Sequence, residues 1–387
     1  MTKKILIISK VNTHPLEMGN SKAILSQAEI LKKLGCEIDF LYVQEIGLGK
    51  GHYEKSKRNF LKTKEYWGEH FIYLRVGKTE KILKNVLSLF RQKVCGGHEG
   101  TYDKYPWKLT SYLKKIQRER KYDICLVQYY YLTKLFKTIK FEKMACFTHD
   151  VFSYKNLIVN EPCPWIDANQ EARAMQLCTD VLAIQEEEKN YYHNLAPQSR
   201  VYNVYSPYSY VETPFVGNHR ILFLSGNNVY NQNGLRWFVY EVFPLVKRKY
   251  SDAKLVIAGG ICKEIKKQYE HIDGIELLGY VEEPVDLYKL GDVAINPTYQ
   301  GTGLKIKTFE AISYGKATMV HPHSMAGVYN KETAPLFSSD KPQEWSDHIE
   351  TIWGQPEVIR EIKKQDELYI QLMNEYIVQE YKRFLSV

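Results

Sequence analysis

The chain alternates short apolar runs with longer amphipathic stretches, and this rhythm occurs twice. Continuous apolar strands separated by helices, such as the one expected at Ser21–Leu34, are typical of a parallel sheet covered on both faces. A segment rich in Pro, Ser and Tyr at 206–217 separates the two halves. The runs predict strands at Ile5–Ser9, Glu37–Val43, Phe71–Val76, Ile124–Tyr129, Ala145–Thr148 and Val181–Ile184, and then at Ile221–Leu224, Lys254–Ala258, Ile275–Tyr280, Val293–Asn296 and Thr318–Val320.

The pattern predicts an α/β protein of two doubly wound, Rossmann-like domains that face each other across a cleft. A length of 387 residues fits two domains. We expect the first to span 1–208 and the second 209–369. Ligands of such sheets bind outside the carboxyl ends of the strands, so the loops after the strands are where chemistry is expected.

The positive charge is concentrated in less than one quarter of the chain. Lys and Arg number 53 against 45 Asp and Glu, a net charge of +8. Residues 50–140 hold 22 basic and 8 acidic residues, which is +14 and leaves −6 for the rest. A local basic region indicates a surface that meets an anionic partner.

The stretch Lys78–Val94 has the pattern of a basic amphipathic helix. We expect its face to lie on an anionic membrane and near a glycolipid acceptor; a helix packed on the sheet with a solvated rim fits the same pattern. We expect no nucleic acid as partner, because no binding motif accompanies the charge, and a homodimer is left open. The cations of the face are Lys78, Lys81, Lys84, Arg91 and Lys93.

Cysteine usage and hydropathy indicate a cytoplasmic protein. The seven cysteines are odd in number and never spaced C-x-x-C, which argues against a disulfide framework or a zinc ribbon. The apolar run near the N-terminus is too short for a signal peptide. No apolar stretch approaches the roughly 18–20 residues that span a bilayer.

One glycine-containing loop carries the clearest chemistry. A strand ending at Asn296 leads into the loop 301–304, Gly-Thr-Gly-Leu, and a helix begins near Lys305. Such a loop presents free backbone N–H groups and the positive end of a helix dipole to an anion. Lys305 and Lys307 add cations, which suits a diphosphate, and Glu310 lies where a carboxylate can accept from ribose hydroxyls. The spacing alone also fits ordinary turn chemistry, and Lys307 alone fits a solvated helix residue.

The block Gly279–Val328 resembles the donor domain of the GT-B glycosyltransferases of family 4, the group 1 glycosyltransferases. Three further stretches follow the order of that family: Ser225–Asn228 with Ala258–Gly260, Glu171–Ile184, and Thr148–Val151. The resemblance implies a retaining transfer of a sugar from a nucleotide-diphosphate sugar to an acceptor hydroxyl, without a metal or another cofactor. It also implies that residues 370–387 return to pack on the first domain.

The resemblance implies roles for individual residues. Lys305 and the amides of the loop would hold the diphosphate, Glu310 the ribose, and a short segment after the third strand of the second domain the nucleobase. His149 follows a strand and would point into the cleft as a catalytic group; it would otherwise tie down a loop through Asp150. The donor-binding set is Gly19, Asn227, Tyr280, Val281, Thr302, Gly303, Leu304 and Lys307, and the catalytic set is His149, Lys305 and Glu310.

One position departs from the family pattern. Many members carry a glutamate eight residues before the one matched by Glu310, and this chain has Thr302 there. A subgroup with the pattern G-x-G-x-K-x-K shares this feature. A non-catalytic partner subunit and a nucleotide-sugar epimerase therefore stay as alternatives. His321 and His323 have no third ligand nearby in the sequence, so we expect no metal site.

Taken together, the residues and the resemblance predict a glycosyltransferase of surface polysaccharide biosynthesis. Its expected partners are a nucleotide-sugar donor, a glycan or lipid-linked acceptor and an anionic membrane surface. We expect it in the cytoplasm, peripherally associated with the inner face of the cell membrane.

Overall fold

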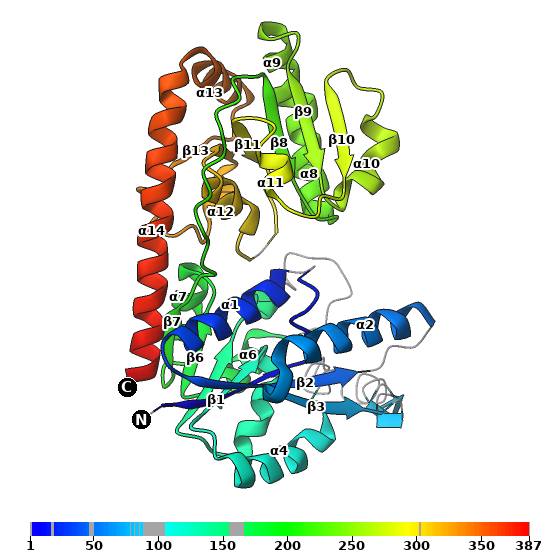
Figure 1. Ribbon diagram of the computed structural model, residues 1–387, viewed down its shortest axis with the longest axis vertical. Coiled ribbons are helices and arrows are strands. Elements are labelled where there is room, and N and C mark those ends of the chain that lie inside the picture. The colour runs from blue at the N-terminus through cyan, green and yellow to red at the C-terminus, as the bar shows by residue number, and fades with distance from the viewer. Residues whose placement is uncertain are drawn as a thin grey trace. The chain divides into compact units, whose positions relative to one another are not determined.

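The chain forms two compact units, each built on one parallel sheet (Figure 1). The computed structural model describes residues 2–386 apart from 17–18, 46–49, 78, 81, 85, 88–104, 155–165 and 302. Unit 1 comprises Met1–Ser206 and Ile377–Val387, and unit 2 comprises Pro207–Tyr376. The predicted α/β class with two Rossmann-like sheets is confirmed.

Unit 1 holds a seven-stranded sheet in the order β3-β2-β1-β4-β5-β6-β7. Every pairing in it is parallel. Its strands are β1 (Lys4–Ser9), β2 (Glu37–Glu45), β3 (Phe71–Val76), β4 (Ile124–Gln128), β5 (Lys143–Phe147), β6 (Asp180–Ala183) and β7 (Arg200–Asn203). Its helices are α1 (Gly19–Lys33), α2 (Lys50–Trp67), α4 (Trp107–Arg120), α6 (Ala168–Met175) and α7 (Glu186–Leu195), with short 3-10 helices η1 (Gly68–His70) and η3 (Tyr130–Lys137).

Alternate residues of the unit 1 strands enter cores on opposite faces of the sheet. Leu6 and Ile8 belong to the core that α4 enters with Leu109 and Leu113. Ile5 and Ile7, which are also fully buried, point to the other face. Figure 1 shows α1 and α4 on opposite faces. This double burial explains why the strands read as continuous apolar runs.

Unit 2 holds a six-stranded parallel sheet in the order β10-β9-β8-β11-β12-β13. Its strands are β8 (Arg220–Leu224), β9 (Lys254–Ala258), β10 (Ile275–Gly279), β11 (Val293–Asn296), β12 (Ala317–Val320) and β13 (Leu336–Ser338). The intervening helices are α8 (Val229–Trp237), the π-helical turn η4 (Phe238–Val242), α9 (Phe243–Lys249), α10 (Ile261–Tyr269), α11 (Val285–Tyr288), α12 (Ile306–Ser313), the 3-10 turn η5 (Pro322–Met325), α13 (Pro342–Gly354) and α14 (Pro356–Ser386).

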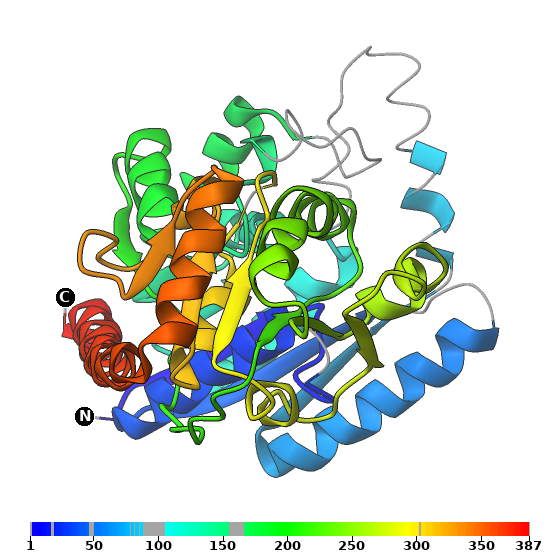
Figure 2. The same cartoon turned by 90° about the horizontal axis from the view of Figure 1, so that it is seen from above.

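Helices cover both faces of the unit 2 sheet (Figure 2). Ile221 and Phe223 of β8 face the larger core, which α8, α9, α10 and α13 complete. Leu222, between them, faces a smaller core with Leu287 of α11 and Ala311 of α12. The smaller core thus holds α12, the helix that follows the glycine loop, against this face of the sheet.

Two strands that the sequence pattern did not predict are β7 and β13, and both lie at a sheet edge. Arg200 and Ser338 are exposed, so neither strand is a continuous buried run. An edge strand has a neighbour on one side only, and its residues are less uniformly buried than those of a central strand.

The final helix, α14, takes part in both units. In unit 1, the Lys143 ammonium donates to the Phe384 carbonyl and the Asn203 N–H donates to Glu380 at 3.1 Å. In unit 2, the side-chain amide of Asn374 pairs with the backbone of Tyr208 at 2.6 and 3.2 Å. Residues 377–387 are therefore part of unit 1, although they are the last in the chain. Among the described residues, no helix is both long enough and apolar enough to cross a bilayer.

Candidate active site

The loop after β11 has the backbone that the sequence predicts for an anion site. Gly301 and Gly303 adopt φ of +93° and +78°, a left-handed conformation that glycine reaches without strain. At Gly301 a Cβ atom would lie 3.1 Å from the ring of Tyr230, so any residue larger than glycine would crowd that ring. Thr302 and its predicted amide contact lie outside the described residues.

Neighbouring elements of unit 2 hold this loop in place. The carbonyl of Gly301 lies 2.8 Å from Nε2 of His323, and Ser324 Oγ donates to the Thr298 carbonyl at 2.6 Å. Asn233 of α8 donates to the side chain of Gln300 at 3.1 Å. His323 is thus occupied with positioning the loop. No group of three or more His, Cys, Asp or Glu that could hold a metal occurs in the described part of the chain.

The start of α12 suits an anion. Its first turn contains no acidic residue, and its N-cap residue, Lys305, makes no side-chain capping bond. Leu304, directly before it, is partly buried, and Lys305 Nζ lies 3.3 Å from the Gly303 carbonyl. Backbone N–H groups at a helix start and a cation beside them form the arrangement that phosphates favour.

Lys307 differs from Lys305 in its surroundings. Its Nζ donates to Asn231 Oδ1 at 2.7 Å and lies 3.4 Å from Ser225 Oγ and 3.3 Å from Thr298 Oγ1. It also lies 4.9 Å from the centre of the Phe223 ring. Desolvation, followed by the charge of Lys305, lowers the pKa of Lys307 to about 7. The alternative of a solvated helix residue is therefore wrong for Lys307.

Glu310 lies one turn further along α12 and is partly buried. The charge of its carboxylate affects the pKa of three tyrosine hydroxyls. Burial first, and the Glu310 charge second, raises the pKa of Tyr208, Tyr288 and Tyr314. Two of these tyrosines, Tyr288 and Tyr314, stack on each other at 4.9 Å between ring centres.

The first three strands of unit 2 end close together. At Gly259, whose φ is +99°, a Cβ atom would lie 2.3 Å from the Ser225 carbonyl oxygen, so only glycine fits. The predicted donor residue Asn227 is exposed and accepts from Gln232 at 2.7 Å. Tyr280 is 77% exposed, and Val281 is partly buried against the smaller core. Because the Tyr280 side chain is largely exposed, it is accessible to a nucleobase.

His149 follows β5 in unit 1 and is held by neighbours from β4. Its Nε2 lies 2.9 Å from Gln128 Oε1, and its ring stacks on Tyr129 at 4.1 Å. Desolvation lowers the pKa of His149 to about 3, so the imidazole is neutral near pH 7. Since Gln128 presents a carbonyl oxygen, Nε2 carries the proton and Nδ1 is an acceptor.

The partners of His149 are residues that the sequence pattern did not indicate. Tyr129 adopts φ of +73°, which is rare for a residue with a side chain, and its hydroxyl accepts from Asn20 at 2.9 Å. Gly19 and Asn20 are already helical, so α1 begins two residues before the expected start at Ser21. The available signal was the place of Tyr129 as the last residue of a predicted strand, at the carboxyl end where ligands of such sheets bind.

Glu171 is a second residue that sequence reasoning did not single out. Its carboxylate is fully buried and accepts from the backbone N–H groups of Phe152 and Ser153, both at 3.1 Å. The Ser153 and Tyr192 hydroxyls also donate to it, at 2.6 and 3.0 Å. Glu171 therefore fixes the turn that follows His149. Another buried carboxylate, Glu188, accepts from the Thr148 hydroxyl at 2.9 Å, and burial and then the charge of Asp150 raise its pKa to about 8.

Most of the predicted membrane-facing cations, namely Lys78, Lys81, Arg91 and Lys93, lie outside the described residues. Lys84 is described, and it is buried, with Nζ 2.9 Å from Glu80. It is not an exposed cation, so its expected role on that face is wrong. The apolar residues around it are exposed: Ile82, Leu83, Val86 and Leu87.

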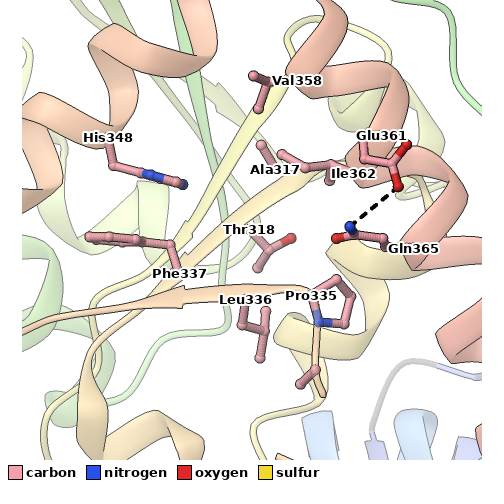
Figure 3. Close-up of a pocket in the computed structure, with 11 residues that line it drawn as sticks. Ala317, Thr318, Pro335, Leu336, Phe337, His348, Val358, Glu361, Ile362 and Gln365 are labelled. Carbon is pink, nitrogen blue, oxygen red and sulfur yellow. Dashed lines mark hydrogen bonds between the residues drawn. The ribbon is translucent and has the colours of Figure 1, made fainter. Parts of the chain in front are cut away.

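A pocket in unit 2 lies away from the predicted donor residues. It has a volume of about 420 Å³, and Figure 3 shows the side chains that line it, from β12, β13, α13 and α14. His348 stacks on Phe337 at 4.0 Å on one side, and Gln365 bonds to Glu361 on the other. None of the predicted donor-binding residues lines this pocket.

Comparisons with known proteins agree with the resemblance. Residues 218–355 match the family described as "Glycosyl transferases group 1". A Klebsiella pneumoniae relative, described as an uncharacterized 44.6 kDa protein in the cps region, is 23% identical over 348 residues, which covers 80% of each chain.

Several solved structures share the fold of this chain at low sequence identity. TarM superposes with a TM-score of 0.69 at 10% identity, covering 100% of this chain and 99% of TarM. The pneumococcal O-GlcNAc transferase GtfA, in complex with UDP and GlcNAc, gives 0.64 at 12% identity, covering 99% and 98%. Anabaena HepE with UDP-glucose gives 0.61 at 12% identity, covering 99% and 100%. The predicted resemblance is confirmed: the chain has the GT-B fold, and residues 218–355 match the group 1 glycosyl transferases.

Proposed function

We propose that the protein is a retaining, metal-independent glycosyltransferase that moves a sugar from a nucleotide-diphosphate sugar to a hydroxyl of a membrane-linked glycan or glycolipid. The observation that carries this proposal is the glycine loop before α12. There, Gly301 and Gly303 in left-handed conformations precede a helix start with no acidic residue in its first turn. This loop lies within the segment that matches the group 1 glycosyl transferases.

The donor diphosphate becomes the leaving group, so its charge must be balanced as the glycosidic bond breaks. In our proposal, the Lys305 ammonium and the first N–H groups of α12 supply that balance in place of a metal. The amides of Thr302, Gly303 and Leu304 would contribute from the loop. Glu310 would accept hydrogen bonds from the ribose hydroxyls. Retention of the anomeric configuration is what the family resemblance implies.

The nucleobase and the sugar are proposed from the similar structures. HepE is described with UDP-glucose and GtfA with UDP and GlcNAc. A UDP-sugar is therefore the first donor to test. Tyr280 and Val281 from the segment after β10, together with Asn227 from the loop after β8, would contact the nucleotide, since both segments leave the same edge of the parallel sheet, with only β9 between their strands.

His149 is proposed as a catalytic group of unit 1. Because its pKa is held near 3, it does not act as a cation or as a general base near neutral pH. A neutral imidazole fixed by Gln128 and Tyr129 supplies a directed hydrogen bond to a sugar hydroxyl. Gly19, at the start of α1, is exposed and would let donor or acceptor approach the backbone closely.

The acceptor is proposed to be attached to a membrane, in surface polysaccharide biosynthesis. The basic region 50–140 supplies +14 of charge, and four apolar side chains in it, at 82, 83, 86 and 87, are exposed. The relative from Klebsiella is described by its place in a cps region. Peripheral binding to the inner membrane face should strengthen with anionic lipid and weaken with salt in a liposome assay.

The test begins with a thermal-shift screen against UDP, GDP, ADP, dTDP and CMP, because a ligand that binds only the native state stabilises it. Transfer from the matching nucleotide sugar is then measured with Lys305→Ala and Glu310→Ala. Both variants should lose donor turnover and remain folded. The controls Lys331→Ala and Glu332→Ala, at exposed positions of the same unit, should keep it. Normal transfer by Lys305→Ala or Glu310→Ala would contradict the proposed site, and donor consumption without acceptor product would favour an epimerase.

A further inference from the structure

The ammonium of Lys307 joins three segments that come from different parts of unit 2. Its partners are Ser225 after β8, Asn231 in α8 and Thr298 after β11, at 3.4, 2.7 and 3.3 Å. Asn231 cannot turn away, since its own amide donates to the Gly226 carbonyl at 3.0 Å. Lys307 therefore holds together the two loops that border the proposed diphosphate site.

All three partners of Lys307 are neutral oxygens. They are the side-chain amide oxygen of Asn231 and the hydroxyls of Ser225 and Thr298. A lysine in this setting keeps its proton less firmly than one paired with an acid, because desolvation penalises the charged form. Its pKa is lowered to about 7, first by desolvation and then by the charge of Lys305.

The charged and titratable groups on the elements around Lys307 are few. Lys305 lies two residues before it, and Glu310 follows three residues later on α12. On the other elements, Arg220 begins β8 and Arg236 lies in the last turn of α8. His323 contacts the same loop through Gly301. Lys305 is the one whose charge acts on the pKa of Lys307.

We propose that Lys307 is a positioning residue that takes up a proton when the donor diphosphate binds, so that donor binding and protonation of this lysine are coupled. The inference rests on the proposed function, because the anion it requires is the diphosphate of a nucleotide sugar. Binding brings two negative charges to the loop that Lys307 supports. Opposite charge favours the ammonium, and the free amine takes its proton from solvent.

The coupling has a size that calorimetry can measure. With a pKa of about 7 in the free protein, about one tenth of Lys307 is protonated at pH 8 and about nine tenths at pH 6. Donor binding should then take up about 0.9 proton at pH 8 and about 0.1 at pH 6. The donor Kd should be about tenfold weaker at pH 8 than at pH 6. The diphosphate of a nucleotide sugar does not titrate in this range.

The experiment measures donor binding by calorimetry at pH 6 and pH 8, in two buffers that differ in ionisation enthalpy. The probes are UDP-glucose, UDP-N-acetylglucosamine, GDP-mannose and ADP-glucose, which share the diphosphate. Proton uptake at pH 8 by the wild-type protein is the expected result and needs no variant. Binding without uptake would overturn the inference and leave the proposed function intact. Failure of every probe to bind would refute both.

Three variants separate this role from a merely structural one. Lys307→Met removes the titrating group, so both the proton uptake and the pH dependence of Kd should vanish. Lys307→Arg keeps a charge at all pH values and should also give a Kd that does not change with pH. Lys305→Ala should weaken binding, keep the uptake and move its midpoint to higher pH, because the neighbouring charge is gone. Uptake that persists in Lys307→Met would assign the proton to another group and overturn the inference.

Discussion

The close approach of α8 to the loop after β11 leads to a quantitative prediction for Gly234→Ala. Gly234 is a buried residue of α8. A Cβ atom there would lie 2.7 Å from the Pro297 carbonyl oxygen and 2.9 Å from both the Pro297 carbonyl carbon and Thr298 Cα. All three are backbone atoms, so neither side can relieve the overlap by rotating a side chain. The helix or the loop must move by several tenths of an ångström.

Two opposing contributions decide the size of the effect. Alanine in place of glycine inside a helix stabilises by about 1 kcal/mol. Inserting a methyl group into a well-packed site costs about 1–3 kcal/mol, and three backbone contacts below 3.0 Å place this site at the upper end. The net loss should be about 2 kcal/mol, or a fall in Tm of roughly 4–8 °C for a unit of this size.

Thermal and urea unfolding of the full chain measure this loss. Gly226→Ala is the matched control, because Gly226 lies on the neighbouring loop with nothing within 4 Å of a Cβ atom; it should change stability by less than about 0.5 kcal/mol. The donor Kd should weaken for Gly234→Ala alone, since α8 carries Asn231, the partner of Lys307. If Gly234→Ala proved as stable as the wild type, the close approach of α8 to this loop would be wrong.

Three further predictions concern the buried carboxylate of Glu171, the stability of the protein in acid and the metal independence of donor turnover. Glu171→Gln should destabilise by about 2–3 kcal/mol in urea, because an amide nitrogen would face donors that now bond to a buried carboxylate; unchanged stability would contradict the role of Glu171. The pKa of His149 is about 3 in the folded protein and about 6.5 when unfolded. The unfolded state therefore binds more protons as pH falls, and stability should drop by about 2 kcal/mol between pH 8 and pH 5. In the same measurement, the free energy of unfolding of His149→Gln should fall less steeply between pH 8 and pH 5. An unchanged slope would mean that other groups cause the loss of stability in acid. Donor turnover should survive EDTA, and loss of activity that Mn²⁺ or Mg²⁺ restores would refute metal independence.

The central strands of both sheets and two of the edge strands, β3 and β10, were predictable from sequence, whereas the edge strands β7 and β13 were not. A strand such as β1 or β11 is buried on both faces, so its apolar run is unbroken and visible. At the edges, β7 and β13 contain exposed residues and are four and three residues long. These two strands form because the fold places a neighbouring strand beside each of them, and no local sequence pattern indicates that pairing.

The site was predictable where its chemistry is local. Gly301, Gly303 and Lys305 are neighbours in the chain, so their spacing already indicates a loop before a helix. The surroundings of Lys307 are assembled from residues up to 82 positions away, and spacing cannot show them. The pair of Lys84 and Glu80 is local, four residues apart, but its burial depends on distant residues such as Trp107, whose N–H donates to Glu80, and a helical pattern could not show that.

The contribution of α14 to unit 1 has a consequence for the order in which the protein is made. Unit 2 is a continuous stretch of chain, Pro207–Tyr376, and all of it is synthesised before the last eleven residues of unit 1, Ile377–Val387. Until those residues leave the ribosome, Lys143 and the Asn203 N–H lack their partners at Phe384 and Glu380. The N-terminal half, although translated first, should thus be the last to reach its native state. A nascent chain stalled before Ile377 should expose unit 1 to proteases while unit 2 is already protected.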